Sequence, residues 1–178
     1  MESIYGSIES ELQSFKISYI LAPELWGKFH TEGIDDLDFS KWKRAKMMDE
    51  KGFLSDETNE IPSELGGIYL YSIMPNVIPG CGCYIMYIGM ASKTPSENLR
   101  YRVRSYKKQF GDEYTRDRIH NLFVRWGKYV YVHYLPVASN KEIIEELEER
   151  LIACFVPPCN SDIRDANVKR AVKAFGEF

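Results

Sequence analysis

The chain has 178 residues, of which 44% are hydrophobic and 28% are charged. It is long enough for one globular domain, and its composition excludes a disordered or fibrous protein, while four cysteines in a chain of this size argue against a disulfide framework. The formal net charge of −3, taken as an average, argues mildly against a nucleic-acid binder.

The N-terminal third is predicted to be mainly helical, because apolar residues recur there at helical spacing in two stretches. They are Ile8, Leu12, Phe15 and Tyr19 in the first stretch and Trp42, Ala45 and Met48 in the second. Residues 55–60 form a polar linker, so residues 1–60 are expected to be an accessory segment for a homodimer or a protein partner. The first residues lack the features of a secretory signal, so we expect a cytoplasmic protein.

Two strands are predicted next, Gly67–Ile73 and Tyr84–Gly89, joined by a long loop into a hairpin. Both lie in the longest uncharged stretch, residues 66–92. This stretch contains five glycines as well as Pro75 and Pro79, so it is not a transmembrane helix and we expect no membrane partner.

The remaining elements are predicted to be mainly helices. They are a basic helix starting near Glu97, a helix over residues 113–126, a strand at Tyr129–Leu135, a helix at Lys141–Phe155 and a helix at Ile163–Phe175. This order predicts an α+β domain over residues 61–163, with a small antiparallel three-stranded sheet flanked by helices. Residues 164–178 are expected to form a C-terminal packing helix.

One acidic residue of the helix at Lys141–Phe155 is predicted to face the apolar side. At 100° per residue, Glu148 lies at about 140° from Ile143, between Phe155 and Ile152. A carboxylate facing a core needs a partner, because burial of an unpaired charge is costly. A structural salt bridge and a metal ion both remain open, and buried ion pairs are the commoner of the two.

The basic helix lies in a block, residues 91–128, that holds 10 lysines and arginines against 4 acidic residues. Such a block is typical of a surface facing a polyanion, and also of an ordinary solvated helix face. The basic side chains on one side of the helix are Arg100, Arg104, Lys107 and Lys108. Arg102 stands apart from them, beside Tyr106 and the apolar stripe.

Three sequence segments resemble, in order, the motifs of the GIY-YIG nuclease superfamily. Gly67-Ile68-Tyr69 followed by Tyr87-Ile88-Gly89 resembles the motif that names the family. The other two are Leu99-x-x-Arg102-Val103-x-x-Tyr106 and Glu148-x-x-Leu151-Ile152-x-x-Phe155-x-Pro157-x-x-Asn160. The arginine and the glutamate of these segments are the same two residues that the helical geometry singles out independently.

The resemblance implies a GIY-YIG-like fold and hydrolysis of DNA phosphodiester bonds with one divalent ion, Mg²⁺ or Mn²⁺. It implies that Glu148 holds the metal, that Arg102 stabilises the transition state and that Tyr69 orients or activates water. Tyr87 and Tyr106 would hold the phosphate or the metal waters, and Asn160 would brace the site or touch the phosphate. The basic side, Arg100, Arg104, Lys107 and Lys108, would bind the nucleic-acid backbone.

Three alternatives remain open from the sequence. A module on the same fold could bind nucleic acid or protein without catalysis, and RNA could replace DNA as the substrate. The pairs Cys81-x-Cys83 and Cys154-x4-Cys159 could suggest zinc, but no histidine has ligand spacing to them, so this is the weakest alternative.

Overall fold

The computed structural model describes residues 15–27, 39–78, 81–108, 117–138 and 140–175. The described residues form an α+β fold around a four-stranded antiparallel sheet with the strand order β1-β4-β2-β3. The strands are β1 (Lys43–Lys46), β2 (Gly66–Ile73), β3 (Tyr84–Ala91) and β4 (Val130–Val137). The helices are α2 (Pro23–Trp26), α3 (Leu99–Lys108), α4 (Asp117–Trp126), α5 (Lys141–Phe155) and α6 (Ala166–Phe175), and short 3₁₀ turns include η2 (Phe39–Lys41), η3 (Asp56–Glu60) and η5 (Gly127–Tyr129). Within these ranges no helix has the length and apolar character needed to cross a membrane.

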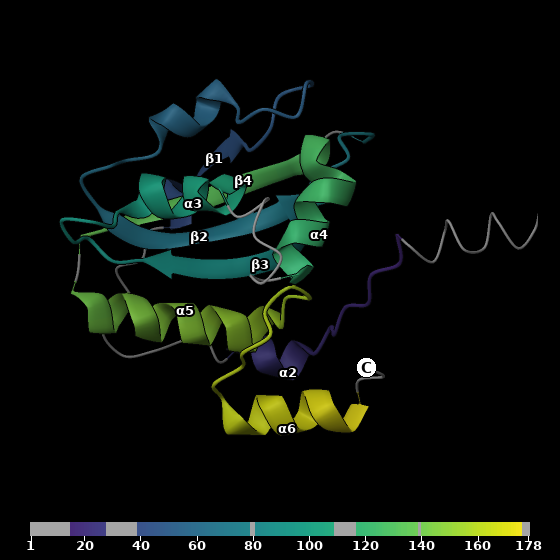
Figure 1. The fold of residues 1–178 in the computed structure, drawn as a ribbon. Helices are drawn as coiled ribbons and strands as arrows, with labels where there is room; N and C mark the ends of the chain where they lie inside the picture. The colour runs from purple at the N-terminus through teal and green to yellow at the C-terminus, as the bar shows by residue number, and fades with distance from the viewer. Residues whose placement is uncertain (1–14, 28–38, 79–80, 109–116, 139, 176–178) are drawn as a thin grey trace, which may run out of the picture.

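The sheet separates two apolar cores, because successive side chains of a strand point to opposite faces. On one face, Tyr69 and Tyr71 pack with residues of α3 and α4, including Val103. On the other face, Ile68 and Ile88 pack with the apolar side of α5. Figure 1 shows α3 above the sheet and α5 below it, with β3 between them at one edge.

The sheet has one strand more than the three expected, because residues 43–46 form a strand rather than a helix. β1 pairs with β4, with Ala45 opposite Val132. The apolar spacing read as helical also fits a strand here, since Ala45 and Met47 are buried while Arg44 is exposed. A short edge strand rich in lysine and arginine is a common protection against strand pairing between molecules.

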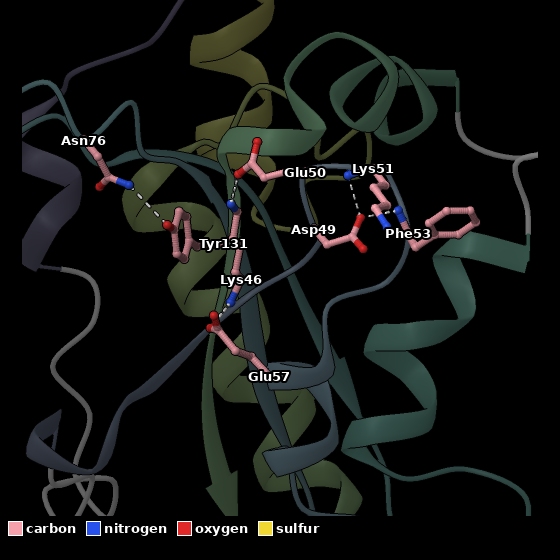
Figure 2. Close-up of polar contacts among 8 residues, drawn as sticks. All are labelled: Lys46, Asp49, Glu50, Lys51, Phe53, Glu57, Asn76 and Tyr131. Atoms are coloured by element: carbon pink, nitrogen blue, oxygen red, sulfur yellow. Dashed lines mark hydrogen bonds and ion pairs between the residues drawn. The ribbon is translucent and has the colours of Figure 1, made fainter.

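The segment after β1 folds back onto that strand, as Figure 2 shows. The backbone N–H of Lys46 donates to Oε2 of Glu57 at 2.7 Å, and its ammonium group pairs with Glu50. Oδ1 of Asp49 accepts hydrogen bonds from two backbone N–H groups further along the turn. The prediction of a linker at residues 55–60 is wrong. Most of this stretch is the 3₁₀ turn η3, in which Thr58 is fully buried.

The other predicted elements agree with the structure to different degrees. The hairpin of β2 and β3 is confirmed, and α5 has the predicted bounds. Residues 16–22 are not helical, contrary to the prediction for Phe15 and Tyr19, whereas Ile8 and Leu12 lie outside the described residues. The helix expected over residues 113–126 is described from Asp117, since residues 113–116 also lie outside.

Candidate functional site

A polar cavity of about 520 Å³ lies at the edge of the sheet formed by β3. Strand β3, helices α3, α4 and α5 and the chain after α5 contribute to its walls. The charged lining residues are Arg102, Arg118, Arg164, Glu145, Glu148, Glu149 and Asp162. The remaining ones are Tyr87, Met90, Ile119, Ile152, Cys159, Asn160 and Ser161. Four carboxylates and three guanidinium groups therefore border one cavity.

Arg102 and Glu148 reach this cavity from opposite faces of the sheet. Arg102 comes from α3 and Glu148 from α5, and β3 is the edge strand between these two helices (Figure 1). The positive charge of Arg102 is close enough to favour the ionised form of Glu148. The two residues that the helical geometry singles out thus meet around the edge of the sheet.

Glu148 is half-buried, and its carboxylate accepts a hydrogen bond from the backbone N–H of Met90. Burial raises the pKa of Glu148 to about 7, although Arg164, this hydrogen bond and Arg102 act in the opposite direction. Among the described residues, no lysine or arginine nitrogen lies within ion-pair distance of it. The structural salt bridge that was one explanation for this carboxylate is therefore not formed within the described part of the chain.

Asn160 closes the outer edge of β3 with two hydrogen bonds. Its Oδ1 accepts from the backbone N–H of Ile88 at 2.9 Å, and its Nδ2 donates to the Ile88 carbonyl at 2.8 Å. Just before it, the backbone N–H of Cys159 donates to the Met86 carbonyl. The turn is set up by Val156, which ends α5 in the left-handed region with a φ of 43°.

The tyrosines of the family-like motif lie in two layers. Tyr87 lines the cavity, whereas Tyr69 is fully buried behind it and does not line the cavity. The two rings are 6.1 Å apart between centroids. Tyr69 lies opposite Gly89 in the β2–β3 register, and its hydroxyl would be 2.5 Å from any Cβ at that glycine. Glycine at position 89 therefore makes room for the Tyr69 ring.

The basic residues expected to bind nucleic acid do not line the cavity. Nε of Arg100 donates to the Ile61 carbonyl at 2.6 Å, and Nη1 of Arg104 donates to Oδ1 of Asn59 at 2.7 Å. These two side chains hold the end of η3 and the residue after it against α3. The side chains of the other predicted residues on this helix, Tyr106, Lys107 and Lys108, lie outside the described residues.

Sequence reasoning missed several residues of the cavity, above all Arg118 and Arg164. Arg164 pairs with Glu149, and it exerts the largest lowering effect on the pKa of Glu148. No motif marks either arginine. The only signal available for Arg118 is its place in the basic block of residues 91–128.

The lining fits a hard divalent cation bound mainly through water. Mg²⁺ is usually held by one or two carboxylates together with waters and substrate phosphates. The half-buried Glu148 is the carboxylate of the lining that could serve in this way. Within the described ranges no group of three or more His, Cys, Asp or Glu residues is arranged to hold a metal ion, so any cation here depends on waters or substrate for most of its ligands.

We expect Asn160→Ala to destabilise the fold by about 1–3 kcal/mol, because it leaves two partly buried backbone groups of Ile88 unbonded. Urea unfolding measures the change, and hydrogen exchange of the Ile88 amide should accelerate. Asn140→Ala is the matched control, since Oδ1 of Asn140 caps α5 through Ile143. It should cost a similar free energy without accelerating exchange at Ile88. Equal exchange at Ile88 in both variants would contradict this role of Asn160.

Comparisons of the chain with protein-family models, with curated proteins and with solved structures found no match. The functional interpretation therefore depends on the motif resemblance and on the geometry of the cavity.

Proposed function

We propose that this chain is a divalent-metal-dependent endonuclease with a GIY-YIG-like domain, acting on DNA in the cytoplasm. The observation that carries the proposal is that Arg102 and Glu148, from helices on opposite faces of the sheet, line one cavity together with Tyr87 and Asn160. In this proposal strands β2, β3 and β4 correspond to the three-stranded sheet of the family, and β1 is an addition.

The cavity offers the groups that phosphodiester hydrolysis requires. Glu148 would hold a Mg²⁺ or Mn²⁺ ion, which supplies Lewis-acid polarisation of the scissile phosphate. Arg102 would donate hydrogen bonds to the nonbridging phosphate oxygens and offset their growing charge. A planar guanidinium suits this task because two of its N–H groups can bind one phosphate.

Tyr87 is the tyrosine best placed to bind the attacking water or a phosphate oxygen, since it lines the cavity. The buried Tyr69 supports the Tyr87 ring from behind in this proposal, so the role in orienting or activating water passes from Tyr69 to Tyr87. Asn160 would hold β3, and with it Tyr87, in place through its bonds to Ile88. It acts as a positioning residue in this account.

The test is cleavage of supercoiled plasmid and of labelled DNA and RNA of one sequence, with Mg²⁺, Mn²⁺ or EDTA. We expect metal-dependent cleavage of DNA by the wild type, and a loss of about 10²–10³-fold in kcat for Arg102→Gln. Arg125→Gln is the matched control, because Arg125 is exposed and does not line the cavity. Equal activity of Arg102→Gln and Arg125→Gln would contradict the proposal, and cleavage of RNA alone would change the substrate class.

A non-catalytic binding module is the second candidate, and one observation favours it. Glu148 and Asn160 already bond to backbone groups of β3, at Met90 and Ile88, so both have a structural use at the sheet edge. Salt-dependent DNA binding by the wild type, without cleavage under any divalent ion, would establish this alternative instead.

A further inference from the structure

Arg118 is the third arginine of the cavity lining, and it forms no ion pair with the residues that the structure describes. Arg118 is exposed, lines the cavity, and donates from Nη1 to the Pro158 carbonyl at 3.1 Å. No carboxylate in the described part of the chain lies within ion-pair distance of it. Arg164, by contrast, is paired with Glu149. Of these two arginines, Arg118 is the one whose positive charge is available to an anion.

Arg118 is held at the cavity by the element that carries it. It lies on α4, and the buried Ile119 beside it also lines the cavity. A planar guanidinium can donate two parallel hydrogen bonds to one phosphate, and such charge-assisted bonds are about twice as strong as neutral ones. An exposed arginine in this position therefore favours a phosphate as its ligand.

The cavity is also larger than one phosphate group requires. Its volume of about 520 Å³ lies within the range of pockets that enclose whole organic ligands, roughly 300–1,000 Å³. Arg118 comes from α4, whereas Arg102 comes from α3 and Glu148 from α5. The three charged groups thus approach the cavity from three different helices, as expected for a site that holds more than one point of a chain of phosphates.

We infer that Arg118 binds a phosphate next to the one that is hydrolysed, so that the cavity holds two successive phosphates of a nucleic-acid strand. This inference rests on the proposed function and deepens it. Arg118 would act in binding and register rather than in the chemical step. Its hydrogen bond to Pro158 would fix the guanidinium relative to the turn that carries Asn160.

The experiment compares duplex DNA binding at 50–200 mM salt, by fluorescence anisotropy, in the background Glu148→Gln, which should not cleave. We expect Arg118→Gln to reduce the slope of log K against log salt by about 1. Arg118→Lys should restore the slope, and Arg125→Gln, on the same helix but outside the cavity, should leave it unchanged. With active protein, Arg118→Gln should raise KM about tenfold and change kcat less than twofold.

Two results would overturn the inference. One is a salt slope of Arg118→Gln equal to that of the parent protein, which is also what a purely structural role predicts, together with a lower melting temperature and a lower kcat. The other is an equal loss of slope in Arg118→Gln and Arg125→Gln. The salt slope is measured on a variant that does not cleave, so the binding test is independent of the cleavage test. If the wild type fails to cleave, the proposed function is overturned. If the slope still changes in Arg118→Gln, the phosphate contact remains supported.

Discussion

Glu148→Gln is expected to remove metal-dependent cleavage while making the fold more stable at pH 8. The loss of activity should be about 10²–10³-fold or greater, because glutamine is a neutral and much weaker ligand for a hard cation. Plasmid cleavage with Mg²⁺ or Mn²⁺ measures it. Gain of stability with loss of activity is the pattern of a group that is retained for function at a cost to folding.

The gain in stability follows from the environment of Glu148. Burial raises its pKa from 4.5 to about 7, so the folded chain binds this proton more tightly than the unfolded chain does. The wild type therefore loses stability between pH 4.5 and about 7, and the loss is complete above that range. Glutamine resembles the protonated side chain and removes this dependence. We expect Glu148→Gln to be about 1–3 kcal/mol more stable at pH 8 and equal in stability at pH 4.

Glu146→Gln is the matched control on the same helix. Glu146 is exposed, pairs with Arg150 on the surface and does not line the cavity. Its replacement should change stability by less than about 1 kcal/mol and leave cleavage intact. Urea unfolding at pH 4 and pH 8 compares the variants. The account of Glu148 fails if Glu148→Gln is less stable than the wild type at pH 8, or if both variants show the same pH dependence.

Gly67→Ala should be the most destabilising of the glycine substitutions, at about 3–5 kcal/mol. Gly67 has a φ of 148°, which side chains rarely adopt, and a Cβ there would lie 2.2 Å from the carbonyl oxygen of Leu135 in β4. Backbone strain contributes about 1–3 kcal/mol and the steric clash a similar amount. Because β2 is a central strand, the backbone at Gly67 cannot move away without breaking pairs with β4.

Substitutions at three other glycines separate the effect of backbone strain from the effect of the steric clash. Gly89→Ala adds only a clash, at 2.5 Å from the Tyr69 hydroxyl, and should cost about 1–3 kcal/mol. Gly52→Ala adds only strain, since its φ is 80° and no atom lies within 4 Å of a Cβ, while Gly27→Ala adds neither. Urea unfolding should rank Gly67→Ala as the most costly and Gly27→Ala as neutral. A Gly67→Ala variant as stable as Gly27→Ala would contradict the register of β2 against β4.

Parts of the fold and of the candidate site could be predicted from the sequence, where local spacing and glycine positions determine the structure. Gly67 is required by the close backbone of β4 and Gly89 by the ring of Tyr69, so both glycines of the motif have a structural role in the sheet. The position of Glu148 was predictable because α5 is long and its apolar side is continuous, which makes helical angles reliable. The hairpin was predictable because two apolar runs with strand-forming residues flank a loop with glycine and proline.

Two features of the structure were not visible in the sequence for the same physical reason, which is that contacts between residues distant in sequence determine them. Ala45 is spaced like a helical core residue, but pairing with β4 makes its segment a strand. Arg100 and Arg104 were correctly placed together on α3, but the sequence does not show that η3 covers that side and takes their hydrogen bonds. Arg118 reaches the cavity only because α4 is packed beside β3 and the turn after α5.

Paramagnetic mapping with Mn²⁺ tests the central claim most directly, because the ion broadens backbone amide signals of nearby residues in an NMR spectrum. We predict that low concentrations of Mn²⁺ broaden the amides of Met90 and Ile88 in β3 and spare Ala45 in β1, at the opposite edge of the sheet. The broadening should disappear in Glu148→Gln and persist in Glu146→Gln. Broadening that is absent from β3 in the wild type, or unchanged in Glu148→Gln, would contradict a cation site at this cavity.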